Sequence, residues 1–312
     1  MLSHLVRAQL AVELLLCLAL GAWLHHRGWN LAAIVAFLAA VSLGIRLLIV
    51  CTSCLVAHAN RSPRDPAQRI GFTGGARLVV HEWHSMLLDN FWWLPFEAIA
   101  VRADPPAGGP LVPVLMVHGY LSNRGLLRPL IGALDRSGAR VHTLNFRGLF
   151  GSIEPLIGQL EAEVQRLVAA SGHPQVVLVC HSMGGLVTRA WLMRHGAQRV
   201  ARLVTIASPH HGTALANLGL GANATQMRRG SEFLRALEAA EGGEGPACPT
   251  TSIYSVHDNL VAPQETSRLP RATNVALHGW GHVGIVAAPP LHAAVTTALR
   301  DSGALPARVA KA

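Results

Sequence analysis

Charged residues are scarce in this sequence, and lysine is almost missing. Only 14% of the 312 residues are charged, whereas 51% are hydrophobic, and the mean hydropathy is +0.34. Such values exclude an ordinary water-soluble domain for the whole chain, so we expect part of it to lie in lipid. Lys311 is the single lysine, and arginine therefore carries nearly all of the positive charge.

The sequence also lacks the usual signatures of a nucleic-acid-binding protein. The net charge is +9, and a basic balance of this kind suits either nucleic acid or an anionic membrane. No zinc-finger spacing, RNP motif or dense arginine cluster is present. We therefore expect a membrane surface, and no nucleic acid, as the partner of the basic residues.

Cysteines are few and do not suggest a disulfide framework. The five cysteines are odd in number, and several lie in apolar runs, which favours a reducing compartment. Cys51 and Cys54 form a C-x-x-C, but no second pair or nearby histidine completes a zinc site. We interpret both as small apolar residues at a helix end and expect neither a metal nor a cofactor.

Two long apolar runs open the chain. A membrane span needs roughly 20 apolar residues. The first run, residues 9–24, approaches this length and reaches it if counted over 5–24, and the second run, residues 31–57, exceeds it. A signal peptide is the alternative for the first run, but no A-x-A cleavage site follows it. We predict a transmembrane helical hairpin over 1–57. Its two charges, Glu13 and Arg46, lie at similar depth, so either they pair or Arg46 extends to the far interface.

Arginines flanking the two runs predict the orientation of the hairpin. The turn carries Arg27 alone, whereas the two ends carry the others. The arginines at the ends are Arg7, Arg61, Arg64, Arg69 and Arg77. Since segments rich in arginine and lysine beside a membrane span stay in the cytoplasm, we expect a bacterial inner-membrane protein whose remaining chain is cytoplasmic.

Residues 58–110 are predicted to connect the hairpin to a second domain. Trp83, Trp92 and Trp93 are suited to the headgroup level of a membrane. The alternative, which we favour, is a first β-hairpin at RLVVHEW, residues 77–83, packed on the next domain. The run DPPAGGP, residues 104–110, is a clear break.

Residues 111–302 alternate between strand-like and helix-like patterns, and 303–312 form a tail. The alternation predicts an α/β domain with a mostly parallel, doubly wound sheet covered on both faces. The strand-like runs are LVPVLMVHG, ARVHTLNFRG, QVVLVCHS, RVARLVTIASP, TTSIYSVHD and ATNVALHG. Within 213–250, SEFLRALEAAEG is a candidate helix of a short lid.

The stretch VVLVCHSMGGLVTRA, residues 176–190, has the outline of a nucleophile elbow. Ser182 follows a Val-rich strand directly and opens an amphipathic helix, as in G-x-S-x-G. Gly184 keeps the second glycine position, whereas Cys180 replaces the first. A cysteine is small and apolar, so we expect it to be tolerated as a spacer.

A serine nucleophile needs a base and an acid that orients the base. Downstream of Ser182, Asp258 and His282 each lie just past a strand, at the sheet edge where Ser182 is expected. Glu265 is the alternative acid. His278 lies within the last strand-like run and is expected to be structural, whereas His257 is expected to point opposite to Asp258 if its strand continues.

The oxyanion hole needs two backbone N–H donors. We assign them to Met183, directly after the nucleophile, and to Tyr120 in the HGY turn, with Leu121 as the alternative to Tyr120. His118 is expected to brace that turn.

Five motifs resemble the α/β-hydrolase family, specifically the bacterial triacylglycerol lipases, over about residues 111–300. They are VHGY, CHSMGG, ASPHHGTALA, SIYSVHDNLVAP and HGWGHVGI. The resemblance implies Ser182, Asp258 and His282 as the triad, and the N–H groups of Tyr120 and Met183 as oxyanion donors. Small lipases of this kind have alanine at the position of Cys180. No Asp lies between His282 and Arg300, so the structural calcium of larger members is not expected.

We therefore expect an α/β-hydrolase fold preceded by a transmembrane hairpin. The expected function is that of a membrane-anchored serine hydrolase that cleaves lipid or other carboxylic esters through an acyl-serine. The alternatives are an acyltransferase or a thioesterase that uses the same triad, and a non-catalytic membrane protein.

Overall fold

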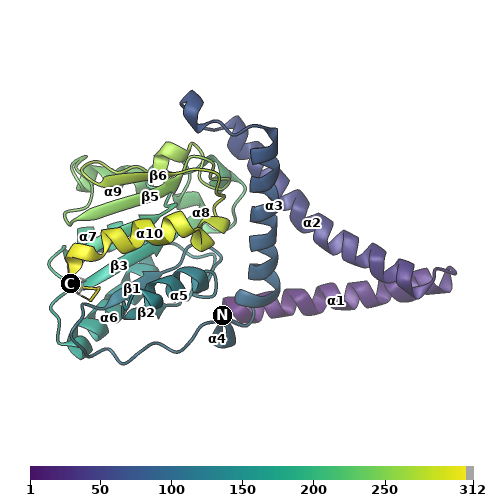
Figure 1. The fold of residues 1–312 in the computed structure, drawn as a ribbon, viewed down its shortest axis with the longest axis horizontal. Helices are drawn as coiled ribbons and strands as arrows, with labels where there is room; N and C mark the ends of the chain where they lie inside the picture. The colour runs from purple at the N-terminus through teal and green to yellow at the C-terminus, as the bar shows by residue number, and fades with distance from the viewer. Residues whose placement is uncertain (307–312) are drawn as a thin grey trace, which may run out of the picture.

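The computed structural model describes residues 1–306. The predicted tail covers residues 303–312, of which 307–312 lie outside the described part. The described chain combines a sheet covered by helices with three long N-terminal helices that stand beside it (Figure 1).

The helices and strands alternate along the chain after residue 113, as the sequence predicts. The helices are Leu2–His26 (α1), Leu31–Ala59 (α2), Phe72–Leu88 (α3), Glu97–Ala100 (α4), Arg128–Arg136 (α5), Glu154–Ser171 (α6), Met183–His195 (α7), Ala222–Gln226 (α8), Glu232–Ala240 (α9) and Pro289–Ala298 (α10). The strands are Val114–Val117 (β1), Val141–Leu144 (β2), Val176–His181 (β3), Val200–Ile206 (β4), Thr250–Ser255 (β5) and Thr273–Leu277 (β6). Short turns of helix are Pro66–Gln68 (η1), Asp89–Trp93 (η2), Ala214–Asn217 (η3), Gln264–Ser267 (η4), Gly284–Ala287 (η5) and Arg300–Ser302 (η6).

The six strands form one parallel sheet in the order β2-β1-β3-β4-β5-β6. The chain runs from β1 to β2 at one edge of the sheet, returns to β3 beside β1, and continues through β4 and β5 to β6 at the other edge. This reversal of direction defines a doubly wound sheet. The predicted fold class is confirmed. All strands point the same way, so their carboxyl ends, and the loops that follow them, meet at one edge.

Helices cover both faces of the sheet because successive strand residues point to opposite sides. In β1, Val114 and Met116 belong to the core shared with α5 and α10, whereas Leu115 and Val117 belong to the core shared with α6 and α7. Helix α10 crosses the near face in Figure 1. All four residues of β1 are buried. The strand is therefore a continuous apolar run in the sequence, as is typical of strands buried on both faces.

The two apolar runs are helices, as predicted, and they form a hairpin that extends away from the sheet (Figure 1). The Arg46 guanidinium forms an ion pair with Glu13 at 2.7 Å, accompanied by a hydrogen bond from the Ser42 hydroxyl to Glu13. The same guanidinium lies over the Phe91 ring. Of the two alternatives for Arg46, the structure has the pair.

The predicted β-hairpin at residues 77–83 is wrong, because this segment lies inside helix α3. The buried residues Leu78, Glu82 and Ser85 recur at the spacing of one helix face. The β-branched pair Val79–Val80 favours a strand locally, but packing of that helix face between α2 and the loops of the α/β domain decides the outcome. The Trp83 indole donates to the Leu43 carbonyl of α2 at 3.1 Å.

Candidate active site

Ser182 lies at a sharp turn between β3 and α7. Its φ of 55° is positive, a conformation that non-glycine residues rarely adopt. This turn lifts the serine above the carboxyl edge of the sheet and places it at the N-terminus of α7, where helix N–H groups and the helix dipole favour negative charge.

Glycines allow the elbow to pack closely on its neighbours. A Cβ at Gly184 would lie 2.8 Å from the backbone carbonyls of Val117 and His118, and one at Gly119 would lie 2.7 Å from the Ser182 Cβ. Neither position has room for a side chain. The elbow is thereby held against the turn that follows β1.

Cys180 is fully buried at the position where the motif usually has glycine. Its thiol lies 3.1 Å from the Thr188 hydroxyl of α7, and burial raises its pKa to about 12. The thiol is therefore neutral and packed in the protein interior, which agrees with the expectation of a spacer.

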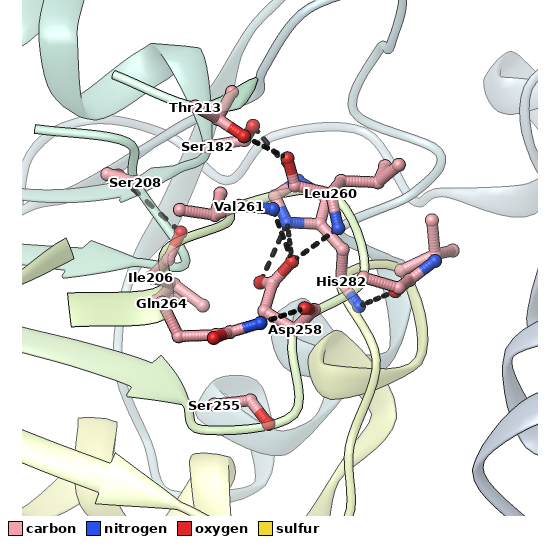
Figure 2. Close-up of polar contacts among 12 residues, drawn as sticks. Ser182, Ile206, Ser208, Thr213, Ser255, Asp258, Leu260, Val261, Gln264 and His282 are labelled. Carbon is pink, nitrogen blue, oxygen red and sulfur yellow. Dashed lines mark hydrogen bonds and ion pairs between the residues drawn. The ribbon is translucent and has the colours of Figure 1, made fainter. Parts of the chain in front are cut away.

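The structure brings Ser182, His282 and Asp258 together in one hydrogen-bonded row. The Ser182 hydroxyl is 3.0 Å from Nε2 of His282, and Nδ1 of His282 is 2.9 Å from Oδ2 of Asp258. With the proton on Nδ1, the imidazole donates to the carboxylate and accepts from the serine. Two backbone N–H groups, of Leu260 and Val261, donate to Oδ1 of Asp258 (Figure 2).

The electrostatic setting of the row suits His282 as a proton acceptor. Burial lowers the pKa of this imidazole, but the Asp258 carboxylate outweighs burial, so the net pKa lies above the ordinary value. His181, whose ring centre is 4.8 Å away, has a pKa well below the ordinary value because it is fully buried. His181 is therefore neutral and does not compete with His282 for the proton.

The two expected oxyanion donors belong to the segments that adjoin Ser182 in sequence or line the same cavity. Met183 is the first residue of α7, where backbone N–H groups have no partner inside the helix. Tyr120 and Leu121 follow β1 and line the same cavity as Ser182. The Tyr120 hydroxyl donates to the Leu220 carbonyl at 2.7 Å, and Leu121 has a φ of 46°.

The remaining sequence candidates lie outside the row. Glu265 is exposed and lies 3.9 Å from Arg268. His118 accepts from the Phe146 N–H and contacts the Gly119 carbonyl, which braces the turn after β1. His257 accepts from the Gly279 N–H. His278 was expected inside a strand, but β6 ends one residue before it.

Sequence reasoning missed the polar residues that hold the His282 loop. Both carboxylate oxygens of Glu82, on α3, accept backbone N–H groups, from Val283 and Gly284, at 2.8 Å each. The Asn259 side chain accepts the His282 N–H at 2.8 Å and donates to the Ser53 hydroxyl of α2. A lone glutamate within the apolar run of α3 was the signal available in the sequence.

A cavity of about 500 Å³ opens above Ser182 and His282. Its walls come from the loops of the α/β domain and also from α1, α2 and α3. The volume falls in the range of small-molecule sites. Within residues 1–306, no group of three or more His, Cys, Asp or Glu side chains is arranged to hold a metal ion.

Comparison with known proteins agrees with this geometry. A family model described as alpha/beta hydrolase fold matches residues 112–230. A triacylglycerol lipase of Burkholderia plantarii is 34% identical over 127 residues, which are 38% of this chain and 35% of the lipase. A lysosomal thioesterase of Rattus norvegicus is 30% identical over 124 residues, or 38% of this chain and 41% of the relative. The matched region thus spans about a third to two fifths of these relatives.

Solved structures share the fold. A lipase B of Aspergillus fumigatus has a TM-score of 0.59 at 23% identity, covering 66% of this chain and 56% of the lipase. A Bacillus licheniformis lipase in mature form has a TM-score of 0.54 at 18% identity, covering 64% of this chain and 96% of that one. The chain has an α/β-hydrolase fold. Its matched region is similar to lipases and to a thioesterase.

Proposed function

We propose that this chain is a membrane-anchored serine hydrolase that cleaves carboxylic esters of lipids. The single observation that carries the proposal is the continuous row from Ser182 through His282 to Asp258, at 3.0 and 2.9 Å. The row lies at the floor of a cavity of about 500 Å³ with largely apolar walls. A polar reacting group beneath an apolar chamber suits an ester that carries an aliphatic chain.

In the proposed mechanism, the Ser182 oxygen attacks the ester carbonyl while Nε2 of His282 takes its proton. The Asp258 carboxylate stabilises the resulting imidazolium and keeps the ring oriented. The N–H groups of Met183 and Tyr120 stabilise the oxyanion. His282 then protonates the departing alcohol, which leaves an acyl group on Ser182. Water, deprotonated by His282, releases the acid and restores the serine.

Thioester hydrolysis is a second candidate, favoured by the similarity to a lysosomal thioesterase. The same row would attack a thioester carbonyl, with a thiol as the leaving group. The two candidates differ only in the leaving group, so parallel assays of oxygen and sulfur esters with the same acyl chain separate them.

The test of the proposed activity is hydrolysis by the purified full chain in vesicles. We expect turnover of p-nitrophenyl butyrate, octanoate and palmitate, and covalent labelling of Ser182 by a fluorophosphonate. Absence of both turnover and labelling, in protein with a cooperative thermal transition, would contradict the proposal. Faster cleavage of the thioester than of the matched ester would favour the second candidate.

The membrane anchor is proposed from the surface of the hairpin. Apolar side chains along α1 and α2 face outward, with Leu15 64% exposed and Leu48 65% exposed. A core helix of a water-soluble protein would bury such residues, whereas a bilayer covers them. Arg46 is buried and Glu13 is half-buried, and their pairing lowers the cost of placing both charges in lipid.

We predict that the hydrolase domain faces the cytoplasm. Arginines concentrate at the two ends of the hairpin, which lie beside the hydrolase domain, while the turn has Arg27 alone. The positive-inside rule then places the domain on the cytoplasmic side. A fluorescent protein fused to the C-terminus should be bright and an alkaline phosphatase fused there inactive. The reverse pattern would contradict this topology.

A further inference from the structure

The cavity above Ser182 is built by two parts of the chain that are far apart in sequence. The hydrolase domain contributes Ser182 and His282 together with Leu121 and Val261. Helix α1 contributes Leu2, Leu5 and Val6, and α2 contributes Ile49 and Val50. The predicted hairpin is therefore more than an anchor, because its ends form a wall of the candidate active site.

The wall residues divide into buried and exposed ones. Val6 and Val50 are buried, at 8% and 3% exposure, whereas Leu5 and Ile49 line the same cavity and stay 46% and 50% exposed. The cavity wall thus reaches the surface of the molecule at Leu5 of α1 and at Ile49 of α2. That surface continues into the apolar, outward-facing side chains of the hairpin.

The cavity wall includes two acidic residues, Glu82 and Asp89, and it still suits a hydrocarbon chain. Glu82 is satisfied by the N–H groups of Val283 and Gly284. Burial, followed by the nearby Glu82 charge, raises the pKa of Asp89 well above its ordinary value, which favours the neutral carboxylic acid. The rest of the wall contributed by α1 and α2 is aliphatic apart from Gln9 and Ser53.

Resting on the proposed hydrolase function, we propose that this chamber is an acyl-chain site shared by the hairpin and the hydrolase domain. The acyl chain of a membrane lipid enters between α1 and α2 and extends along Val6 and Val50, with its carbonyl at Ser182. The exposed apolar rim at Leu5 and Ile49 connects the chamber to the layer in which the hairpin is embedded.

The test compares a short-chain fluorophosphonate with a hexadecyl fluorophosphonate, both added to vesicles that contain the full chain. In Val6→Trp and Val50→Trp the indole takes up part of the chamber where the acyl chain would lie. Each methylene group of the acyl chain that can no longer be buried lowers the binding affinity about fourfold. We therefore expect the ratio of long-chain to short-chain labelling rates to fall at least tenfold. Rates are divided by the final labelled fraction, so misfolded protein does not count.

Leu15→Trp is the matched control, since Leu15 lies on the same helix but faces outward and does not line the cavity. It should keep the wild-type ratio. If Val6→Trp and Val50→Trp both keep that ratio too, the acyl-chain site is wrong while the proposed function stands. If no fluorophosphonate labels the wild type, the proposed function fails and the acyl-chain site with it.

An independent observation concerns Glu82. This buried carboxylate binds two consecutive N–H groups directly after His282. Its Oε2 fills the space beside Gly281, and the His81 ring together with the same oxygen fills the space beside Gly284. The contact joins α3 to a loop some 200 residues away in sequence. We infer that Glu82 is a positioning residue, which holds the His282 loop so that Nε2 stays within reach of Ser182.

The pH profile of kcat/KM distinguishes positioning from simple packing. The charged or titratable groups that face His282 are Asp258 after β5, Glu82 on α3 and His181 on β3. Burial raises the pKa of Glu82, and the N–H groups of Val283 and Gly284 oppose that shift and favour its carboxylate form. The carboxylate raises the pKa of His282, and Glu82→Gln removes that contribution. In Glu82→Gln, the acidic limb of the profile should therefore move to lower pH, and kcat/KM should fall about tenfold.

Glu163→Gln is the control, because Glu163 forms a surface pair with Arg166 on α6. It should leave both the limb and the rate unchanged. Glu82→Ala should lower kcat/KM further than Glu82→Gln, because it removes the acceptor as well as the charge. A Glu82→Gln profile that coincides with that of Glu163→Gln would overturn the inference, whereas Ser182 labelling in the wild type tests the proposed function separately.

Discussion

Replacing Ser182 by alanine is expected to lower ester hydrolysis on the order of 10⁶-fold, the loss typical of a serine nucleophile. The reason is that the Ser182 oxygen, 3.0 Å from Nε2 of His282, is the atom that forms the acyl intermediate in the proposed mechanism. Turnover of p-nitrophenyl butyrate by purified protein measures the effect.

The Ser182→Ala protein should remain folded, because the hydroxyl makes no contact other than that with His282 among the described side-chain hydrogen bonds. Its thermal transition is expected to lie close to that of the wild type. Substantial activity in this variant would exclude Ser182 as the nucleophile. Loss of activity together with loss of the thermal transition calls for Ser182→Cys as a second, near-isosteric test.

Replacing His282 by alanine is expected to be about as damaging as Ser182→Ala, since the base and the nucleophile act as one unit. Asp258→Asn should cost less, on the order of 10⁴-fold, because the acid orients and stabilises the base without reacting itself. Both effects are measured as kcat/KM on the same short-chain ester.

The pH dependence of the wild type follows from the state of His282. Attack needs the neutral imidazole, so kcat/KM should rise with pH through the pKa of His282, which Asp258 keeps above its ordinary value. In Asp258→Asn the acidic limb should therefore move to lower pH. An unchanged limb, or a larger loss in Glu265→Gln than in Asp258→Asn, would show that the acid is not Asp258.

The candidate nucleophile could be predicted because the elbow is a local pattern. A Val-rich strand, Ser182 and the first turn of a helix are contiguous in sequence, and Gly184 marks the close approach to β1. Asp258 and His282 could be predicted from topology, since parallel strands bring their carboxyl ends to one edge. Their hydrogen bonds in the structure follow that logic.

Residues whose contacts depend on distant packing could not be predicted. The local preference of Val79 and Val80 for a strand hid a helix, and with it the contact of Glu82 to the His282 loop. Asn259 is adjacent to Asp258 in sequence, but its partner Ser53 lies 206 residues away. Local sequence patterns do not predict contacts between residues so far apart in the chain.

The role of the hairpin was likewise only partly visible in the sequence. Helices α1 and α2 are apolar nearly all round, so hydrophobic periodicity does not tell a lipid-facing side chain from one that faces protein. Val6 and Leu15 are similar in sequence terms, yet one lines the cavity and the other faces outward. The Glu13–Arg46 pair was one of two alternatives, and only the relative placement of the helices decided between them.

Trapping the acyl-enzyme tests the central claim most directly. The full chain in vesicles is mixed with a slowly hydrolysed p-nitrophenyl ester, quenched in acid within the first turnover, and digested for peptide mass spectrometry. We predict an added acyl mass on the peptide that contains Ser182, formed in step with a burst of p-nitrophenol and absent in Ser182→Ala. Steady release of p-nitrophenol without any acyl mass on Ser182, or an acyl mass on another residue, would contradict the account.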